Sequence, residues 1–437
     1  MSAWLEGHPG LPRLLAGLSA GGGPMSLAEH ERVHGQLPDP SQWELIESIE
    51  RSGLRGRGGA DFPTARKLRA VASARRPSAV VVNGSETEPA SAKDQLLLSR
   101  LPHLVLDGAV LAARAIGTRQ VIVQVGAHSA GSVAALEGAL ALREDRVQVD
   151  VVETPGGYVA GEESAVIHYL NGGEPLPTFV PPRPFERGYR GRATLIQNPE
   201  TLAQVALVAR FGDHWYRELG TAADPGSALV TISGAVREPG VYELAFGTSM
   251  VDLIDAAGGE TEPLRALLVG GYFGTWVGAD DAFELRLARE DLRSVGCTLG
   301  AGVLFALGES SCGLHESARV IDYLAEQSAG QCGPCVYGLR AIADSLATIA
   351  EGRAPATELG SVQRWSSEIR GRGACHHPDG ATRFVASALS VFANEIDWHR
   401  HERCAARPAG LPLGGPTVRR PGHVKSRAGR LPAGSGR

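Results

Sequence analysis

Residues 79–83 read AVVVN, residues 120–125 read QVIVQV and residues 147–152 read VQVDVV. Each run is short, apolar and rich in β-branched side chains, which is typical of a strand buried inside a sheet. Helix-like stretches separate the three runs, at residues 102–116 and 129–143. Strands that alternate with helices in this way predict a parallel α/β sheet.

The sequence after this sheet indicates two further units. Residues 227–244 read SALVTISGAVREPGVYEL, two strand-like runs around the turn Glu238-Pro239-Gly240, and a helical pattern follows at residues 249–257. This order fits a small β-grasp domain. From residue 314 to about residue 398 the pattern is helical, with breaks at glycine-containing segments.

These changes of pattern predict five segments along the chain. They are an N-terminal helical lead-in at residues 1–50, an α/β domain at 51–219, a β-grasp domain at 227–308, a helical domain at 312–400 and a disordered basic tail at 405–437. The tail is rich in Pro and Gly and has seven Lys or Arg and no Asp or Glu. Such a tail more often solvates a chain end or docks an acidic partner than binds nucleic acid, so we expect no nucleic-acid partner.

Composition limits the class of protein. A chain of 437 residues can build real hydrophobic cores, and its six cysteines are unevenly spaced, so we expect a reducing compartment without a disulfide framework. The apolar run at residues 14–18 is too short for a signal peptide, and no run approaches eighteen apolar residues. We therefore expect a cytoplasmic protein with no direct membrane span.

The loop at residues 53–62, GLRGRGGADF, contains four glycines and two arginines. It follows a helix-like stretch at residues 43–51, whereas a dinucleotide fingerprint follows a strand, and Asp61 stands where the third glycine would be. The loop suits a phosphate or a flat cofactor that the main chain approaches closely. A flexible surface turn explains the same residues equally well.

Three further polar loops have the composition of ligand sites. NGSETEP at residues 83–89 comes directly after a strand, at the edge where open α/β sheets bind ligands. YVAGEE at residues 158–163 and QNPET at residues 197–201 are the other two. Each alone could be a solvated loop.

Three of the six cysteines form a pattern suited to a metal or to electron transfer. Cys332 and Cys335 lie in the stretch QCGPC, and Cys375 follows. With His376 or His377 they would also satisfy a structural zinc ion, whereas thioredoxin chemistry would need a preceding strand that residues 325–331 do not show. We expect Cys297, Cys312 and Cys404 to be small buried hydrophobes, although Cys404 has His399 and His401 beside it.

Taken together and in this order, the four loops and the cysteines resemble the flavin- and NADH-binding subunit of respiratory complex I and its relatives in NAD-linked hydrogenases and formate dehydrogenases. The resemblance runs from about residue 53 to residue 392. It implies a Rossmann-like FMN- and NADH-binding domain, then a ubiquitin-like β-grasp domain of the SLBB type, then a helical iron–sulfur domain. The fold class it implies is thus α/β in its central part.

The resemblance also implies roles for particular residues. Two positions match those that stack on nicotinamide and hydrogen-bond NADH, Phe62 and Glu88. The family's FMN site maps onto Gly56, Arg57, Gly58, Lys67, Asn83, Glu86, Tyr158, Gly161, Glu162, Glu163, Asn198 and Thr201. Lys67 and Arg57 are expected to offset the phosphate charge, and no catalytic acid or base is expected because the cofactor carries the chemistry.

This chain departs from the family pattern at several positions. Asp61 and Ala65 replace two glycines, Ser85 replaces an Asp, and Gln197 replaces an Asn. The segment that helps to hold the NADH adenine reads VPPR at residues 180–183 in place of Lys-Pro-Pro-Phe. The first cysteine of the family's 4Fe–4S motif is Ala329 here.

Three cluster ligands therefore remain: Cys332, Cys335 and Cys375. A 4Fe–4S cluster would need a fourth ligand such as His376, His377, Cys404 or water, and a 3Fe–4S cluster would need none. The resemblance implies electron transfer from NAD(H) through FMN and the iron–sulfur cluster to a ferredoxin or a 2Fe–2S subunit. A non-catalytic FMN- or zinc-binding interaction subunit is the alternative.

Overall fold

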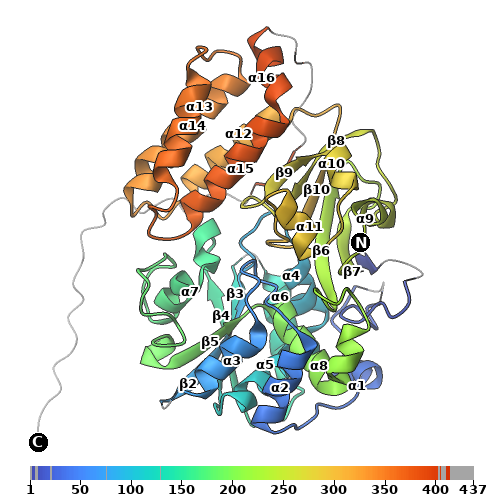
Figure 1. Ribbon diagram of the computed structural model, residues 1–437. Helices are drawn as coiled ribbons and strands as arrows, with labels where there is room; N and C mark the ends of the chain where they lie inside the picture. Colours follow the sequence, from blue (N-terminus) through green and yellow to red (C-terminus); the bar gives the residue numbers. More distant parts are fainter. Residues whose placement is uncertain are drawn as a thin grey trace, which may run out of the picture.

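Four parallel strands form the sheet that the apolar runs predict (Figure 1). The spatial order is β4-β3-β2-β5. The strands are β2 (Ser78–Gly84), β3 (Gln120–Gly126), β4 (Gln148–Thr154) and β5 (Ala193–Gln197). The predicted parallel α/β sheet is confirmed, and β5 is the strand that the sequence patterns did not single out.

The structure is a computed structural model. It describes residues 2–4, 8–19, 22–74, 76–127, 129–401, 404 and 410–413.

Helices cover this sheet and bury its β-branched side chains in two cores, a large one on one face and a smaller one against α7 on the other. The sheet's helices are α2 (Gln42–Ser52), α3 (Thr64–Ala72), α4 (Lys93–Arg100), α5 (Pro102–Ala115), α6 (Ala130–Leu140), α7 (Glu163–Leu170) and α8 (Pro199–Arg217), with the short 3-10 turns η1 (Tyr158–Gly161) and η2 (Tyr189–Gly191). Ser41 begins α2 with a capping box to Glu44, and Asn198 begins α8 by accepting the Glu200 N–H. Asn198 is thus fixed at the carboxyl end of β5.

Within the described residues, the structure has no single helix that is both long and apolar enough to span a membrane. Helices α4 and α5 together have the length and composition for it, but they are bent by 95° relative to one another. Nearly every residue of α5 is buried in the core of the α/β domain.

A mixed six-stranded sheet forms the second unit, in the order β1-β7-β6-β10-β8-β9. Its strands are β1 (Ser2–Trp4), β6 (Ser227–Gly234), β7 (Gly240–Ala245), β8 (Leu264–Val269), β9 (Thr275–Gly278) and β10 (Val303–Gly308). Its helices are α9 (Met250–Ala256), α10 (Ala279–Phe283) and α11 (Arg289–Ser294). The expected hairpin, β6 and β7, and the helix after it are present.

The N-terminal segment differs from the helical lead-in that we expected. It contains α1 (Leu27–His34) and α2, but β1 pairs in parallel with β7 at the edge of the second sheet. The buried Glu243 of β7 explains how the segment is held, because its carboxylate accepts the backbone N–H groups of Arg13, Leu14 and Leu15.

The C-terminal unit is helical, as the patterns predict (Figure 1). It consists of α12 (Gly313–Glu326), the π-helical turn η3 (Pro334–Leu339), α13 (Arg340–Ala350), α14 (Glu358–Ile369), α15 (His377–Val391) and α16 (Ala393–Arg400). Its core is continuous with one face of the second sheet through Trp276 and Phe384.

The predicted disordered tail lies outside the described residues except for 410–413. Those four residues pack on the protein: the Gly410 and Leu411 N–H groups donate to the Glu316 carboxylate, and Leu411 is buried. The prediction of disorder is therefore wrong for this short stretch, because Glu316 and an apolar surface of α12 hold it.

Candidate functional site

The predicted ligand loops meet at the carboxyl edge of the four-stranded sheet. The Asn83 side chain, at the end of β2, donates a hydrogen bond of 2.8 Å to the Gly161 carbonyl. A Cβ on Gly161 would lie 2.8 Å from Thr87 Oγ1, so glycine is needed where η1 approaches the loop after β2. The loops at residues 83–89 and 158–163 thus form one surface.

The glycine-rich loop joins the same surface through β5 and α8. The Arg57 N–H donates to Thr201 Oγ1 at 2.9 Å, and a Cβ on Gly58 would lie 3.2 Å from the Asn198 side chain. The Arg57 guanidinium is buried and pairs with Tyr216 and Glu200. Arg57 therefore braces the loop from behind, and the expectation that its charge faces a phosphate is not met.

Phe62 and Lys67 remain available at this surface. The apolar side chain of Phe62 is 40% exposed. The Arg66 guanidinium lies over its ring. Lys67 Nζ pairs with the partly exposed Glu163. These two residues can contact a ligand without rearrangement of the core.

The N-terminus of α3 adds anion-binding groups next to Lys67. Pro63, the cap residue, makes no side-chain capping bond, and the first turn contains no acidic residue. Thr64 Oγ1 is buried without a hydrogen-bond partner. The Thr64 N–H is bonded to the Leu54 carbonyl, but the unpartnered hydroxyl and the neighbouring lysine at a helix N-terminus suit a phosphate group.

Glu86 has a strained backbone and a fixed side chain. Its φ angle is 38°, which a non-glycine residue seldom adopts. Its carboxylate accepts the N–H groups of Asp94 and Gln95 and the hydroxyl of Ser91, at 2.7–2.9 Å. Burial, with a contribution from Asp94, raises the pKa of Glu86 to about 7.

Glu88 lies deeper, between the α/β domain and the β-grasp unit. It accepts hydrogen bonds from the Tyr158 hydroxyl at 2.9 Å and the Tyr272 N–H at 2.8 Å. Burial raises the pKa of Glu88 to about 7 despite these donors. A carboxyl group with this pKa can exchange a proton near neutral pH.

A buried charged network, which sequence reasoning did not assign, supports these loops. Lys93 Nζ lies 2.7 Å from Asp94 and 2.9 Å from Glu200, and the Asn198 amide donates to Asp94 at 2.6 Å. Burial alone would lower the pKa of Lys93, but Asp94 and Glu200 more than offset it, so the pKa is raised. The only sequence signal was the position of Lys93 and Asp94 shortly after the loop at residues 83–89.

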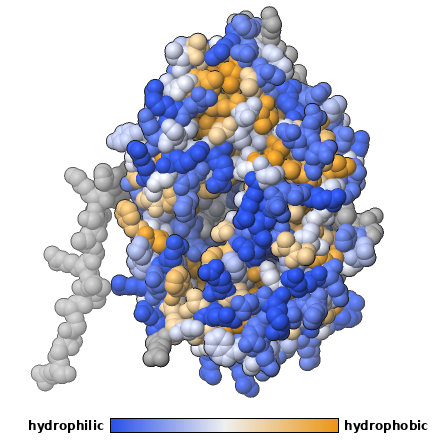
Figure 2. Space-filling view, viewed as in Figure 1, coloured by the Kyte–Doolittle hydropathy of each residue, from blue (hydrophilic) through white to orange (hydrophobic). Residues whose placement is uncertain are grey.

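A cavity of about 180 Å³ lies behind the glycine-rich loop, and residues 288–302 of the β-grasp unit form its other wall. The surface is hollowed between the α/β domain and the upper units on the face shown in Figure 2. Asp61 spans this boundary, with ion pairs to Arg55 at 3.0 Å and Arg289 at 2.8 Å. Its φ angle of 47° is one that a glycine would adopt freely, and Asp is among the side chains that tolerate it.

The three motif cysteines come together at the end of α12. Cys335 lies close enough to Cys332 and Cys375 that both, after burial, raise the pKa of its thiol.

The candidate fourth ligands differ in their surroundings. The His377 Nε2 is 2.7 Å from the Leu324 carbonyl, whereas the His376 side chain is 97% exposed and lies beside Asp379. Cys404 lies beside Cys312, at the start of α12, whereas the motif cysteines lie near the end of this helix. The helix has 14 residues and is therefore about 21 Å long. Cys404 is therefore excluded as the fourth ligand, and Ala329 leaves that position without a side-chain ligand of its own.

The cysteine group and the ligand loops are adjacent. The Tyr158 N–H donates to Gln327 Oε1 at 3.0 Å, two residues before Ala329. Burial raises the pKa of the Cys375 thiol, and the charge of Glu162 raises it further, which places Glu162 near Cys375. The Tyr158 ring also packs edge-on against His377.

These observations test whether the expected cofactors fit. For FMN, the surface offers Lys67, the unpartnered Thr64 hydroxyl at α3, the unpartnered Gln197 Nε2 and glycines at close approaches. For an iron–sulfur cluster, three converging thiols are present, and the His377 N–H donates to the Cys375 sulfur. The residues fit both groups, with a ligand set of three cysteines for the cluster.

Family models match three parts of the chain. The Nuo51 FMN-binding domain matches residues 49–207, the SLBB domain matches residues 229–271, and the NADH-ubiquinone oxidoreductase-F iron–sulfur binding region matches residues 315–399. These ranges fall on the four-stranded sheet, the six-stranded sheet and the helical unit.

The chain is also similar to whole proteins. It is 30% identical to the second NADH-quinone oxidoreductase F subunit of Rhizobium meliloti (strain 1021) over 91% of this chain and 96% of that protein. It is 30% identical to the NADH-quinone oxidoreductase F subunit of Streptomyces coelicolor over 84% of this chain and 85% of that protein.

Two crystal structures of NAD+-reducing NiFe hydrogenase are similar as well. The H2-reduced structure aligns with a TM-score of 0.77 at 31% identity, covering 82% of this chain and 63% of that chain. The air-oxidized structure aligns with a TM-score of 0.79 at 28% identity, covering 92% and 72%. This chain thus spans somewhat less than two thirds of the first of these hydrogenase chains.

Proposed function

The chain belongs to the family of NADH-quinone oxidoreductase F subunits, the FMN- and iron–sulfur-binding flavoproteins, and on that premise we propose that it oxidises NADH and passes the electrons singly to a protein partner. The observation that carries this proposal is the contact between the two sites. Tyr158 belongs to a flavin-site loop, and its N–H is bonded to Gln327 beside the cysteine group. Electrons that arrive at the loops therefore have a short route to the cluster.

The FMN site would be formed at the edge of the four-stranded sheet. When bound, FMN supplies the exchange between a two-electron donor and a one-electron acceptor. Lys67 and the N-terminus of α3 would hold the phosphate, while Asn83, Glu86 and Thr201 keep the loops in place. No residue is required to take a proton from the substrate in this scheme.

NADH would approach past Phe62, whose exposed ring can stack on nicotinamide, and Glu88, which can accept a hydrogen bond. The segment at residues 180–183 lacks the family's lysine and phenylalanine, but Phe179 beside it is 82% exposed. We propose that Phe179 or Arg183 contacts the adenine. Arg183 can stack on a base or pair with a phosphate.

The cluster would be held by Cys332, Cys335 and Cys375. Because Ala329 provides no thiolate, we propose a 3Fe–4S cluster, or a 4Fe–4S cluster whose fourth ligand is water or His376. His377 is less suited, since its Nε2 is held by the Leu324 carbonyl. The altered ligand set would shift the reduction potential.

The electron acceptor would be a ferredoxin or a 2Fe–2S subunit in the cytoplasm. Val336 and Tyr337 directly follow Cys335, and both are large apolar or aromatic side chains exposed on η3. Exposed aromatic groups of this kind are enriched where proteins dock. A partner bound there would lie next to the cluster.

A second candidate is a non-catalytic subunit that binds FMN or zinc and docks other proteins. Ala329 and the altered segment at residues 180–183 favour it. The open Lys67–Glu163 pair favours catalysis, since a scaffold does not need it.

An anaerobic titration of the reconstituted protein with NADH distinguishes the two. Flavin and iron–sulfur absorption are followed in the same sample. We expect both to bleach. Flavin that stays oxidised with NADH but is reduced by dithionite would support the non-catalytic candidate, and so would a preparation that binds no flavin.

A further inference from the structure

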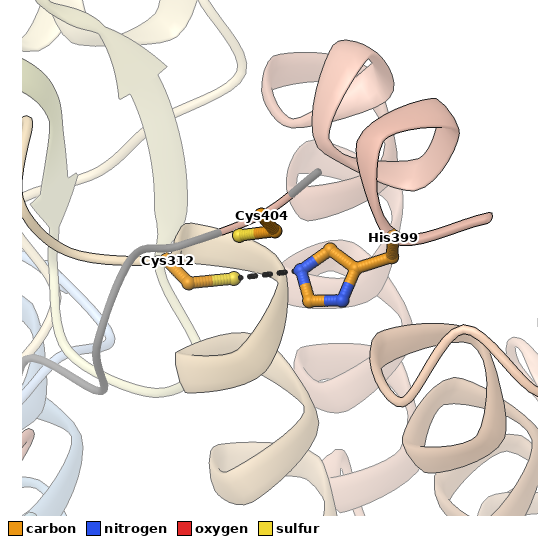
Figure 3. A group of neighbouring side chains, drawn as sticks. All are labelled: Cys312, His399 and Cys404. Carbon is orange, nitrogen blue, oxygen red and sulfur yellow. Dashed lines mark hydrogen bonds between the residues drawn. The ribbon is translucent and has the colours of Figure 1, made fainter. Parts of the chain in front are cut away.

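A second group of sulfur and nitrogen ligands lies at the other end of the helical unit (Figure 3). Cys312 begins α12, His399 lies in α16, and Cys404 follows α16. One ligand atom from each of the three lies within 4.8 Å of the other two, and Cys312 Sγ is 3.1 Å from His399 Nε2. In Figure 3 the two sulfur atoms and the imidazole point toward one another.

The spacing agrees with a tetrahedral metal site. Zinc bonds of about 2.3 Å to sulfur and about 2.0 Å to nitrogen place a sulfur and a nitrogen ligand about 3.5 Å apart, and two sulfurs about 3.8 Å apart. The observed sulfur–nitrogen distance of 3.1 Å lies just below this value, and the other pairs lie within 4.8 Å. A small adjustment of side chains would therefore admit the ion.

The surroundings orient the ligands as metal sites require. The His399 ring is hydrogen-bonded to the backbone of Ala350, an arrangement that fixes the ring of a metal-bound histidine. The His315 N–H donates to Cys312 Sγ at 3.3 Å, a contact that favours the thiolate.

The charges of the group balance. Two thiolates neutralise a divalent cation, and the buried Glu395 carboxylate, 3.2 Å from Cys312 Sγ, is neutralised by Arg265 at 2.6 Å. Glu395 also offers an oxygen ligand beside the site. Zinc prefers thiolate and imidazole ligands, and two thiolates with one neutral imidazole give a site of zero net charge when Zn2+ is bound.

We propose that Cys312, His399 and Cys404 bind a zinc ion whose fourth ligand is an oxygen from Glu395 or water. The metal holds Cys404, four residues after the end of α16, against the start of α12. Farther along the chain, the Leu411 N–H is bonded to Glu316 of the same helix, and the Tyr272 hydroxyl donates to the Pro412 carbonyl. The ion thus fixes the chain at Cys404, and these hydrogen bonds fix it again at residues 411 and 412.

This site is separate from the electron-transfer cysteines, which lie about 21 Å away along α12. Its loss would leave the iron content unchanged, so its test does not depend on the proposed oxidoreductase activity.

The test measures zinc and iron together in full-length protein purified under reducing conditions and reconstituted with its cluster. We expect about one zinc per chain in the wild type and in Cys297→Ser, which removes a buried thiol of the β-grasp unit. We expect at least a tenfold lower zinc content in Cys404→Ser, with iron unchanged. Equal zinc in the two variants would overturn the proposal, as would a Cys312–Cys404 disulfide in the reduced preparation.

Cobalt substitution supplies a second readout that needs no folded variant. In iron-loaded wild-type protein prepared without zinc, Co2+ should produce intense sulfur-to-cobalt charge-transfer absorption that one equivalent of zinc abolishes. Absence of this absorption would contradict the site even if Cys404→Ser failed to fold.

Discussion

The hydroxyl of Tyr158 donates a hydrogen bond of 2.9 Å to the carboxylate of Glu88, and both side chains are buried. The bond joins the loop after β2 to η1, and the Tyr272 N–H ties the same carboxylate to the β-grasp unit. Three parts of the chain thus depend on the ionisation of one buried group.

We expect this ionisation to appear in the pH dependence of stability. The folded-state pKa of Glu88 is about 7, above the ordinary value of 4.5, so the folded protein binds more protons than the unfolded chain between these values. The contribution of Glu88 to stability is present below pH 4.5 and is lost as pH rises to about 7. In urea unfolding, Glu88→Gln should reduce the fall in the free energy of unfolding between pH 4.5 and pH 7 by roughly 3 kcal/mol. Glu144→Gln, which changes an exposed carboxylate, is the control and should leave this fall unchanged.

Lys67→Met should weaken FMN binding. It removes the cation at α3 and leaves Glu163 unpaired near the phosphate. A charge-assisted hydrogen bond is worth about 1.5–3 kcal/mol, so Kd should rise by roughly 10- to 100-fold in a flavin fluorescence titration. Arg69→Met, on the exposed side of the same helix and paired with Glu50, is the control. Equal affinities would place the phosphate elsewhere.

Ala329→Cys should restore a fourth thiolate to the cluster. We expect a fully cysteine-ligated 4Fe–4S cluster with a changed electron paramagnetic resonance signal and slower reoxidation of the reduced protein by oxygen. Ser328→Cys places a thiol one residue away and should leave the signal as in the wild type. An unchanged spectrum in Ala329→Cys would mean that another ligand already fills the position.

The buried histidines near α5 predict acid sensitivity. Burial lowers the pKa values of His34 and His103 to about 4, and neighbouring cationic groups add to the effect. The unfolded chain therefore binds more protons between pH 4 and 6.5, and the stability that these groups contribute above pH 6.5 is lost as pH falls to about 4. His103→Gln should flatten the difference between urea midpoints at pH 7 and pH 5. The exposed His214→Gln should retain the full difference.

Much of the architecture follows from local patterns. The run at residues 79–83 predicts β2, and the carboxyl-edge rule then places Asn83 and Glu88 at a ligand site. The turn at residues 238–240 likewise predicts the β6–β7 hairpin. In each case the signal lies within a few neighbouring residues.

Long-range partners could not be predicted in this way. Gln327 and Tyr158 are 169 residues apart, and Cys312 and His399 are 87 apart, so no spacing rule connects them. Arg57 was predicted to offset the charge of a phosphate, but its guanidinium pairs with the buried Glu200 inside the protein. These contacts depend on which helices and strands pack against one another, and local sequence patterns do not predict that packing.

The hydrogen bond from Tyr158 to Gln327 makes the flavin-site loop η1 depend on the helical unit. Gln327, Tyr323 and His377 supply part of the wall around Tyr158, although they belong to the helical unit. A chain cut before α12 would expose that wall to water and free the η1 loop. The conformation of the η1 loop in the flavin-binding region therefore depends on residues of the helical unit as well as on its own domain.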